Sequence, residues 1–255
     1  MNNQNVEMLI ATMHQPESDY SLLEKMNIQS DAIVCNQCER FSFKEFSWHG
    51  HNIKWYDFNE KGVGINRNNA LMRATGDIIV FCDDDMTYED GYPAKLVDGF
   101  DRNPQADVLI FNIEGRGKNN SPSKVTKLNY LRYGAARIAA KREEIISNGI
   151  LFNLCFGGGT EHQHGEDNIF LCDCLNKGLR VFTYPVLIAR LNADRPSTWR
   201  KDFDTKYFKD QAALYKQISR RYWKYLALID AIKHGKRRYG CSWSKAFKMM
   251  ITPEE

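Results

Sequence analysis

The segment DIIVFCDDDM, residues 77–86, constrains the fold more than any other part of this 255-residue sequence. Its apolar run at 77–82 predicts a buried, central strand of a parallel sheet. Three carboxylates, Asp83, Asp84 and Asp85, follow directly, and burying them without partners would cost several kcal/mol. A divalent cation removes this cost, because Mg²⁺ or Mn²⁺ binds carboxylate oxygens and bridges them to phosphates. The alternative is a solvated acidic turn or helix cap.

The position of these acids favours a binding role. Residues two apart in a strand project to the same side, so Asp83 and Asp85 are the pair expected to face a common site. Ligands of open α/β sheets bind beyond the carboxyl ends of the strands, where this acidic run lies. We therefore predict a metal site at Asp83 and Asp85.

Short apolar runs alternate with amphipathic stretches over residues 1–113, which is typical of βαβ units and a parallel sheet. The pattern predicts strands at 6–13, 31–35, 52–58, 77–82 and 106–113, and helices at 18–26, 64–75 and 92–101. Gly76 is expected to end the second of these helices as a left-handed cap.

The pattern is less regular after residue 113. It predicts a mobile loop at 114–127, helices at 141–147 and 167–177, an irregular segment at 153–165 and a strand at 180–184. From residue 201 onward it is helical, basic and aromatic. We expect one large α/β domain at 1–200 and a helical basic region at 201–255.

Charge is distributed unevenly along the chain. The whole sequence has 35 basic and 32 acidic residues, but residues 216–248 hold ten Lys or Arg and a single acid, Asp230. This local net charge of +9 leaves −6 for the rest. Tyr and Trp are interleaved with the basic residues, a composition that suits an anionic membrane surface better than nucleic acid. The alternative is a helix packed by its aromatics with a solvated basic face.

Nothing in the sequence predicts membrane insertion or export. No run approaches the ~20 apolar residues of a membrane span. The N-terminus MNNQN lacks a charged and then apolar leader, so we expect a cytoplasmic protein, at most peripheral to the membrane. Seven cysteines are an odd count, and reduced thiols are expected in that compartment.

Two further segments carry candidate binding residues. In KGVGINRNNALMRATGD, Arg67 and Asn68 fall in the first turns of the helix that precedes the aspartate strand. An Arg fork suits a diphosphate, although a solvated helix surface is the alternative. In GGGTEHQHGEDNIF, the glycines at 157–159 permit close backbone approach. His162 and His164 could bind metal or phosphate, or simply be solvated.

Glu166 and Asp167 stand at the start of the helix predicted at 167–177. They can cap that helix or act as a general base. A helix N-terminus lowers a carboxylate pKa and so weakens a base, and burial or the neighbouring acid would have to offset this.

Taken together, residues 6–208 resemble the family 2 glycosyltransferases of the GT-A fold. The resemblance rests on the blocks MLIATMHQ, GVGINRNNALMRATGDIIVFCDDDM, FGGGTEHQHGEDNIFLCDCLNKGLRVFTYP and STWRKDFDTKYF. The last two are similar to bacterial enzymes that build capsular and cell-surface polysaccharides. The implied fold is Rossmann-like, with a mostly parallel sheet flanked by helices, a nucleotide-sugar half at 1–113 and an acceptor half at 114–200.

The resemblance also implies roles for individual residues. Asp83 and Asp85 match the DxD motif that holds Mn²⁺ or Mg²⁺ on the donor diphosphate, and Asp167, beside Glu166, matches the catalytic base. The expected nucleotide-sugar contacts are Thr12, Asn36, Gln37, Arg67, Asn68, Asp83, Asp84, Asp85, Gly158 and Gly159.

The implied reaction is metal-dependent transfer of a sugar, with inversion, from a nucleotide-diphosphate donor to a glycan or lipid-linked acceptor. Two departures leave the nucleotide open, although UDP is the commonest in the family. Asn36 and Gln37 stand where an Asp usually reads the base, and the first strand ends Ala-Thr-Met instead of Pro-Thr-Tyr.

Two other functions remain at this point. A nucleotidyltransferase also uses paired aspartates and Mg²⁺, but it would carry a Gly-rich basic loop after the first strand, where this chain has TMHQPESD. A non-catalytic protein that binds a membrane surface or nucleic acid through 216–248 is the second.

Overall fold

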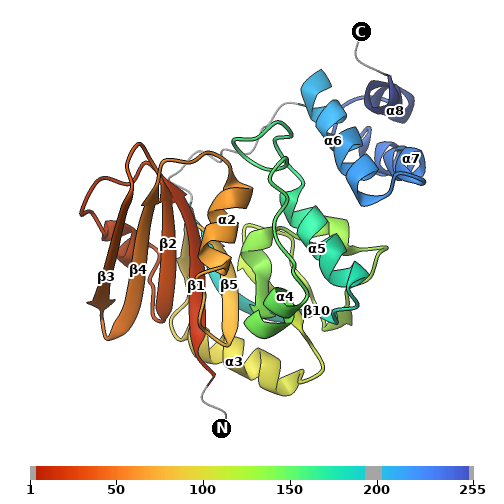
Figure 1. The fold of residues 1–255 in the computed structure, drawn as a ribbon. Coiled ribbons are helices and arrows are strands. Elements are labelled where there is room, and N and C mark those ends of the chain that lie inside the picture. Colours follow the sequence, from red (N-terminus) through yellow and green to blue (C-terminus); the bar gives the residue numbers. More distant parts are fainter. Residues whose placement is uncertain (1–3, 193–202, 253–255) are drawn as a thin grey trace.

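The computed structural model describes residues 4–192 and 203–252. A ten-stranded mixed sheet forms the body, in the order β3-β4-β2-β1-β5-β9-β7-β10-β6, with β8 paired to β10. Helices cover both faces of the sheet, and three C-terminal helices lie together at one side of the body (Figure 1). None of the helices within the described ranges is long and apolar enough to cross a bilayer.

The N-terminal half contains the parallel strands that the sequence predicts. They are β1 (Val6–Met13), β2 (Asp31–Gln37), β4 (His51–Phe58) and β5 (Ile78–Asp83). β1 lies between β2 and β5, and β2 also pairs with β4, all in parallel. Because these strands are parallel, their carboxyl ends meet at one edge, where β5 delivers its aspartates.

The other half of the sheet is partly antiparallel. It contains β6 (Met86–Tyr88), β7 (Val108–Glu114), β8 (Ser123–Lys124), β9 (Ile138–Lys141) and β10 (Val181–Leu191). β9 lies between β5 and β7 and is antiparallel to both, whereas β7 and β10 are parallel. Two short 3₁₀ turns, Tyr130–Arg132 and Ala135–Arg137, precede β9.

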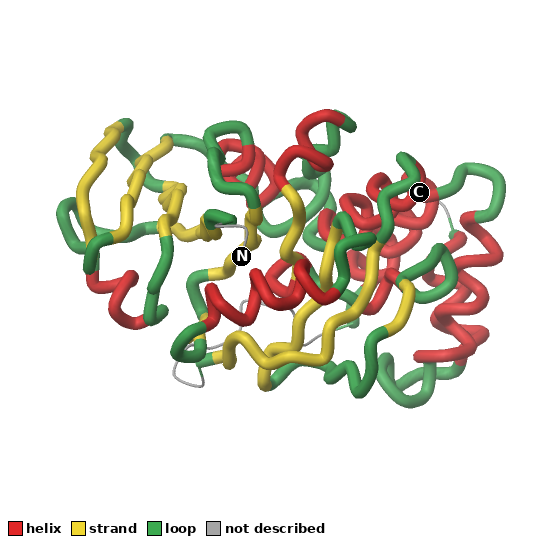
Figure 2. The backbone as a smooth tube through the Cα atoms, turned by 90° about the horizontal axis from the view of Figure 1, so that it is seen from below, coloured by secondary structure: helices red, strands yellow, loops and turns green. Residues whose placement is uncertain are grey.

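Alternating residues of the strands build two cores, one on each face of the sheet. Met8 and Ile10 of β1 pack on one face with α1 (Ser21–Lys25) and α3 (Tyr92–Arg102). Leu9 packs on the other face with α2, α4 and α5 (Figures 1 and 2). These three helices span Val63–Leu71, Arg142–Ser147 and Glu166–Asn176. Alternation with a period of two therefore produces a three-layered α/β body.

The C-terminal helices have a core of their own. They are α6 (Thr205–Ile218), α7 (Trp223–His234) and α8 (Trp243–Ile251). Phe208, Tyr215 and Met250 are buried among them with small alanines. These helices lie where the sequence predicts a helical region, and the predicted domain boundary near residue 200 falls outside the described residues.

Several predictions of local structure were wrong or incomplete. The sequence pattern missed β3 (Ser42–Trp48), β6, β8 and β9, and it ended β10 seven residues early. Gly76 is not a left-handed cap, because α2 already ends at Leu71. Gly76 instead lies against Glu7, whose carboxylate accepts its N–H at 2.8 Å. A Cβ at position 76 would lie 2.7 Å from Glu7 Cβ, so close approach requires the glycine.

Candidate active site

The carboxyl ends of β1 and β5 lie side by side and bring the first polar residues together. Ala11 pairs with Asp83 in register, which sets Thr12 beside Asp84. Thr12 Oγ1 donates a hydrogen bond to Asp84 Oδ2 at 2.6 Å. The predicted acidic edge is therefore present, and Thr12 belongs to it.

Arg67 of α2 joins this edge to the start of α5. Its Nη2 donates to Asp83 Oδ1 at 2.7 Å and its Nη1 donates to Glu166 Oε1 at 2.8 Å. The side chain is only 5% exposed, and its guanidinium carbon lies 5.3 Å from the centre of the Phe152 ring. Burial opposes the charge, but the two carboxylates outweigh it and raise the pKa of Arg67. Residues far apart in the sequence thus meet at one buried cation.

Asp85 is the acid best suited to a cation. Its Oδ1 is buried and accepts no hydrogen bond from any residue that the structure describes. Burial raises the pKa of Asp85, and the charges of Asp83 and Asp84 raise it further, although Arg116 opposes them. A buried carboxylate oxygen without a donor is the kind of atom that a divalent metal satisfies.

The described residues contain no group of three or more His, Cys, Asp or Glu side chains arranged to hold a metal. Mg²⁺ usually takes only one or two carboxylates, with waters and substrate phosphates as its other ligands. Asp83 and Asp85 therefore fit a metal shared with a diphosphate and do not form an all-protein cage. The metal itself stays a prediction.

Asp167 has the properties of a general base. It lies at the start of α5, is 7% exposed, and accepts the Asn168 N–H at 2.7 Å. Burial raises the pKa of Asp167 to about 7, with a further contribution from Glu166 against the opposing charge of Arg67. Burial and the neighbouring acid thus outweigh the helix N-terminus, which on its own would lower this pKa.

Glu166 and Asp167 are adjacent, but their surroundings differ. Glu166 is ion-paired with Arg67, whereas Asp167 has no cation within hydrogen-bonding distance among the described residues. The sequence predicted both as catalytic. The geometry favours Asp167 for proton transfer and Glu166 for holding Arg67.

The glycine-histidine segment, residues 157–165, packs against the start of α2. Gly157 has φ +104°, and a Cβ there would lie 2.5 Å from Val63 Cγ1 and 2.9 Å from Glu166 Cδ. The carbonyl of Gly158 accepts the Val63 N–H at 2.9 Å. Gly158 and Gly159, predicted as donor contacts, thus bring the segment to α2, and their contact with a nucleotide sugar stays a prediction.

The remaining predicted contacts use their amides within the protein. Asn36 donates to Asp57 at 2.7 Å and Gln37 donates to the Gly62 carbonyl at 2.9 Å. Asn68 bonds both backbone polar atoms of Phe152. These three side chains join neighbouring elements, and nothing in the geometry tests their role in nucleotide binding.

Asp57, at the carboxyl end of β4, is a buried acid that the sequence analysis missed. It accepts hydrogen bonds from Arg40, Ser42, Asn36 and Trp55. Burial alone would raise its pKa, but these donors lower it. The signal was an Asp near the end of a predicted strand, and in the sheet it pairs in register with Asn36 of β2.

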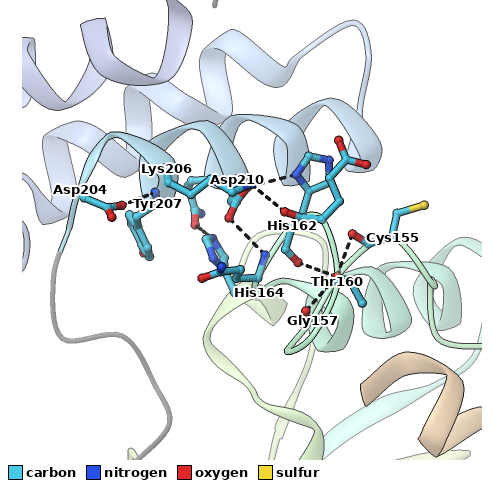
Figure 3. Close-up of polar contacts among 12 residues, drawn as sticks. Cys155, Gly157, Thr160, His162, His164, Asp204, Lys206, Tyr207 and Asp210 are labelled. Carbon is cyan, nitrogen blue, oxygen red and sulfur yellow. Dashed lines mark hydrogen bonds and ion pairs between the residues drawn. The ribbon is translucent and has the colours of Figure 1, made fainter. Parts of the chain in front are cut away.

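A second polar cluster ties the glycine-histidine segment to α6 (Figure 3). Asp210 is 1% exposed at its side chain and accepts hydrogen bonds from Lys206 Nζ at 2.6 Å and from the Gln163 N–H at 3.1 Å. His162 Nδ1 lies 3.1 Å from the same carboxylate. His164 bonds Gln211 and stacks on Tyr207. The two histidines therefore face α6 and are not simply solvated.

Comparison with known families decides the class of protein. The family model described as Glycosyl transferase family 2 matches residues 41–158. The chain is a glycosyltransferase, and just under half of its length is similar to family 2. The match favours sugar transfer over the nucleotidyltransferase and the non-catalytic binding protein. The matched range contains Arg67, Asp83 and Asp85 but ends before Glu166 and Asp167, so the match does not reach the predicted base.

Solved structures of S. aureus TarS share the fold of this glycosyltransferase. TarS 1-349 in complex with UDP matches with a TM-score of 0.62 and 16% identity, over 91% of this chain and 73% of that chain. TarS 1-349 in complex with UDP-GlcNAc matches with a TM-score of 0.63 and 16% identity, over 97% and 76%. TarS itself gives 0.61 and 15%, over 97% of this chain and 43% of that one.

At such low identity the likeness establishes the GT-A fold predicted from the sequence, and no more. No curated protein matches the glycosyltransferase by sequence.

Proposed function

We propose that this glycosyltransferase moves a hexosyl group from a UDP-sugar to a hydroxyl of a glycan or lipid-linked acceptor, with inversion, in surface polysaccharide synthesis. The observation that carries the proposal is Asp167, a buried acid with a pKa of about 7 that is linked through Glu166 and Arg67 to the aspartate edge. UDP is favoured because the structures of TarS that share this fold hold UDP and UDP-GlcNAc.

Asp167 supplies the proton acceptor in this mechanism. Its carboxylate takes the proton of the acceptor hydroxyl while that oxygen attacks the anomeric carbon of the donor sugar. The new C–O bond forms as the bond to the diphosphate breaks, and a single displacement of this kind inverts the anomeric centre. A base with a pKa near 7 is substantially ionised at neutral pH and still basic enough to accept a proton.

Arg67 and Glu166 position the reacting groups. The two terminal nitrogens of Arg67 are ion-paired with Asp83 and Glu166. Arg67 therefore fixes the distance between the aspartate edge, where the donor would bind, and the base Asp167. The charge that Glu166 keeps beside Asp167 also raises the pKa of the base. Arg67 therefore acts through its neighbours and not as a free diphosphate ligand.

Asp85, with its unsatisfied Oδ1, and Asp83 are the residues that would hold a divalent metal. A bound Mg²⁺ or Mn²⁺ supplies Lewis-acid stabilisation of the negative charge that develops on the departing diphosphate. Because nucleotide sugars are charged and do not cross a bilayer, we place the enzyme in the cytoplasm.

Thermal unfolding with nucleotides tests the donor site. We expect UDP with Mn²⁺ to raise the melting temperature, and GDP, CMP and dTDP to do so much less. A ligand at a hundredfold excess over its Kd stabilises the native state by about 2.7 kcal/mol. Asp85→Ala should lose the part of the UDP-induced rise in melting temperature that depends on Mn²⁺. Asp101 is an exposed acid on α3, and Asp101→Ala should keep the full rise. No shift with any nucleotide would contradict the proposal.

Transfer assays with Asp167→Asn test the base. The variant should lose activity by about 100-fold or more, as removal of a general base does, while its UDP-induced shift persists. Asp173→Asn on the same helix is the matched control and should stay active. Loss of UDP binding together with transfer in Asp167→Asn would contradict the assignment.

A further inference from the structure

The exposed charges of residues 216–248, in the C-terminal helices, are all of one sign. Residues 216–248 contain ten basic side chains, and all ten are exposed: Lys216, Arg220, Arg221, Lys224, Lys233, Lys236, Arg237, Arg238, Lys245 and Lys248. The single acid, Asp230, is largely buried and accepts a hydrogen bond from Tyr239 at 2.6 Å. The charged side chains that residues 216–248 expose to solvent are therefore all cationic.

An apolar stripe runs along α7 within this cationic surface. Tyr222, Tyr225, Ile229 and Ile232 are spaced by three or four residues, and each is more than half exposed. At 100° per residue they fall within an arc of about 80°. Ile229 and Ile232 are each 61% exposed, which is unusual for aliphatic side chains in a folded domain.

The stripe lies on the outer face of the helix. Ala227 and Ala231 of α7 are fully buried against α6 and α8, and the same angular arithmetic puts them on the opposite side. Arg221 and Lys233 flank the stripe, and the guanidinium carbon of Arg221 lies 5.3 Å from the centre of the Tyr222 ring. Tyrosines, isoleucines and flanking basic residues are the composition of a helix that lies in a membrane interface.

We propose that the outer face of α7 docks on an anionic lipid bilayer. Tyr225, Ile229 and Ile232 would enter the boundary between headgroups and acyl chains, and the surrounding Lys and Arg would contact the anionic headgroups. This docking goes beyond the transfer reaction and does not depend on the proposed donor or acceptor.

Other partners fit this surface less well. Nucleic acid would satisfy the charges but leave the aliphatic stripe in water or against phosphates. A second copy docked through the same face would bury the stripe but bring two clusters of +9 together, which is repulsive. An anionic bilayer satisfies both the charges and the stripe.

Docking would also place the active site relative to the membrane. α6 belongs to the same helical unit as α7 and is bonded through Asp210 to the segment that leads into Asp167. The base would then be held at a fixed height above the lipid surface, where a lipid-linked acceptor would be presented.

Vesicle flotation of the full chain tests the proposal. We expect binding to vesicles of phosphatidylcholine with one-third phosphatidylglycerol, at least about tenfold weaker binding to phosphatidylcholine alone, and weakening by salt. Ile229→Asp/Ile232→Asp should abolish binding. Lys233→Glu/Lys236→Glu should weaken it at least about tenfold, and Lys25→Glu/Lys177→Glu, with the same change of charge elsewhere, should not.

All changed positions are exposed, so circular dichroism and thermal unfolding should match the wild type and exclude misfolding. Equal binding to both kinds of vesicle, or full binding by the isoleucine variant, would overturn the proposal. Concentration-dependent dimers that the isoleucine variant abolishes, without vesicle binding, would assign the face to a second copy. Binding to RNA without binding to vesicles would equally overturn it.

Discussion

Two buried ionic clusters hold the glycine-histidine segment, and they are opposite in charge. At one end, a buried cation, Arg67, is shared by the carboxylates of Asp83 and Glu166. In the middle, a buried anion, Asp210, is shared by Lys206, the Gln163 N–H and His162. The first cluster lies within the α/β body, and the second joins that body to the C-terminal helices.

The balance of charge explains why the clusters behave differently. Arg67 and Arg116 face more acids than they can neutralise, so burial and the surplus negative charge raise the pKa of Asp85 and Asp167. Asp210 is paired with one cationic side chain, Lys206. Burial alone would raise the pKa of Asp210, but its hydrogen bonds with Lys206, His162 and the Gln163 N–H lower it. A surplus of buried acid prepares one cluster for metal binding and proton transfer. The balanced cluster can only hold the segment in place.

Removing the buried cation should have the largest effect. Arg67→Met keeps most of the volume but leaves the buried Glu166 without its cation and removes the nearer of the two cations beside the partly buried Asp83, so we expect a loss of about 3–5 kcal/mol in the free energy of unfolding. Transfer should vanish with it. Urea denaturation measures the loss of unfolding free energy. The control is Arg102→Met, which breaks an exposed ion pair with Asp98.

A second variant keeps this prediction testable if Arg67→Met does not fold. Arg67→Met/Glu166→Gln removes one of the stranded charges and should recover part of the lost stability. If Arg67→Met were no less stable than Arg102→Met, Arg67 would not be the cation that holds the two acids.

The difference between the clusters also shows which parts of the site can be predicted from the sequence. The aspartate edge was predictable because β5 and its acids are contiguous and the alternation of strands and helices is a local pattern. Its neighbour Thr12 was named only through the family resemblance, whereas Asp167 was also marked by its place at the start of a predicted helix. The strand β9 was not, because four residues, IAAK, are too few to show a period, and its antiparallel insertion depends on β5 and β7.

Long-range pairing is what sequence reasoning could not supply. Arg67 was assigned to a diphosphate because a fork of donors suits one, yet its partner Glu166 is 99 positions away. Asp210 lies in the region predicted only as helical, basic and aromatic, and nothing local marks it as the partner of His162, 48 positions earlier. The sequence indicates what chemistry each side chain can perform, but which residue it pairs with depends on how the chain packs.

The pH dependence of Asp167 gives a smaller effect that sharpens the comparison. The pKa of Asp167 is about 7 in the native protein against 3.8 as its ordinary value, so the native state binds the proton more tightly than the unfolded state. Its contribution to stability is therefore present below pH 4 and is lost as the pH rises to about 7. Asp167→Asn should gain stability relative to the wild type across this window and hold that gain above it.

Activity should follow the opposite course, because only the ionised carboxylate accepts a proton. We expect kcat/KM of the wild type to fall about tenfold per pH unit below pH 7. Urea denaturation from pH 4 to 8 and initial rates over the same range measure the two effects. A stability difference that does not change with pH would mean that Asp167 has an ordinary pKa, and Asp101→Asn provides the baseline.

The balanced cluster should give the smallest effect. Asp210→Asn keeps the shape of the side chain but weakens its bonds to Lys206 and His162, which are partly exposed and can be solvated in place. We expect a loss of about 1–2 kcal/mol, below that of Arg67→Met. Because the cluster positions the segment before Asp167 without touching the donor site, kcat should fall several-fold while the UDP-induced shift stays the same.

Asp204→Asn separates this positioning role from simple loss of helix stability. Asp204 caps α6 through the Tyr207 N–H at 2.8 Å, and Asn caps about as well as Asp, so this variant should keep both stability and kcat. If Asp210→Asn lowered stability but left kcat unchanged, Asp210 would only join the helices to the body. If it raised the Kd for UDP as much as it lowered kcat, the cluster would act on the donor site. A change in kcat alone would show that Asp210 affects proton transfer at Asp167 through the glycine-histidine segment that joins them.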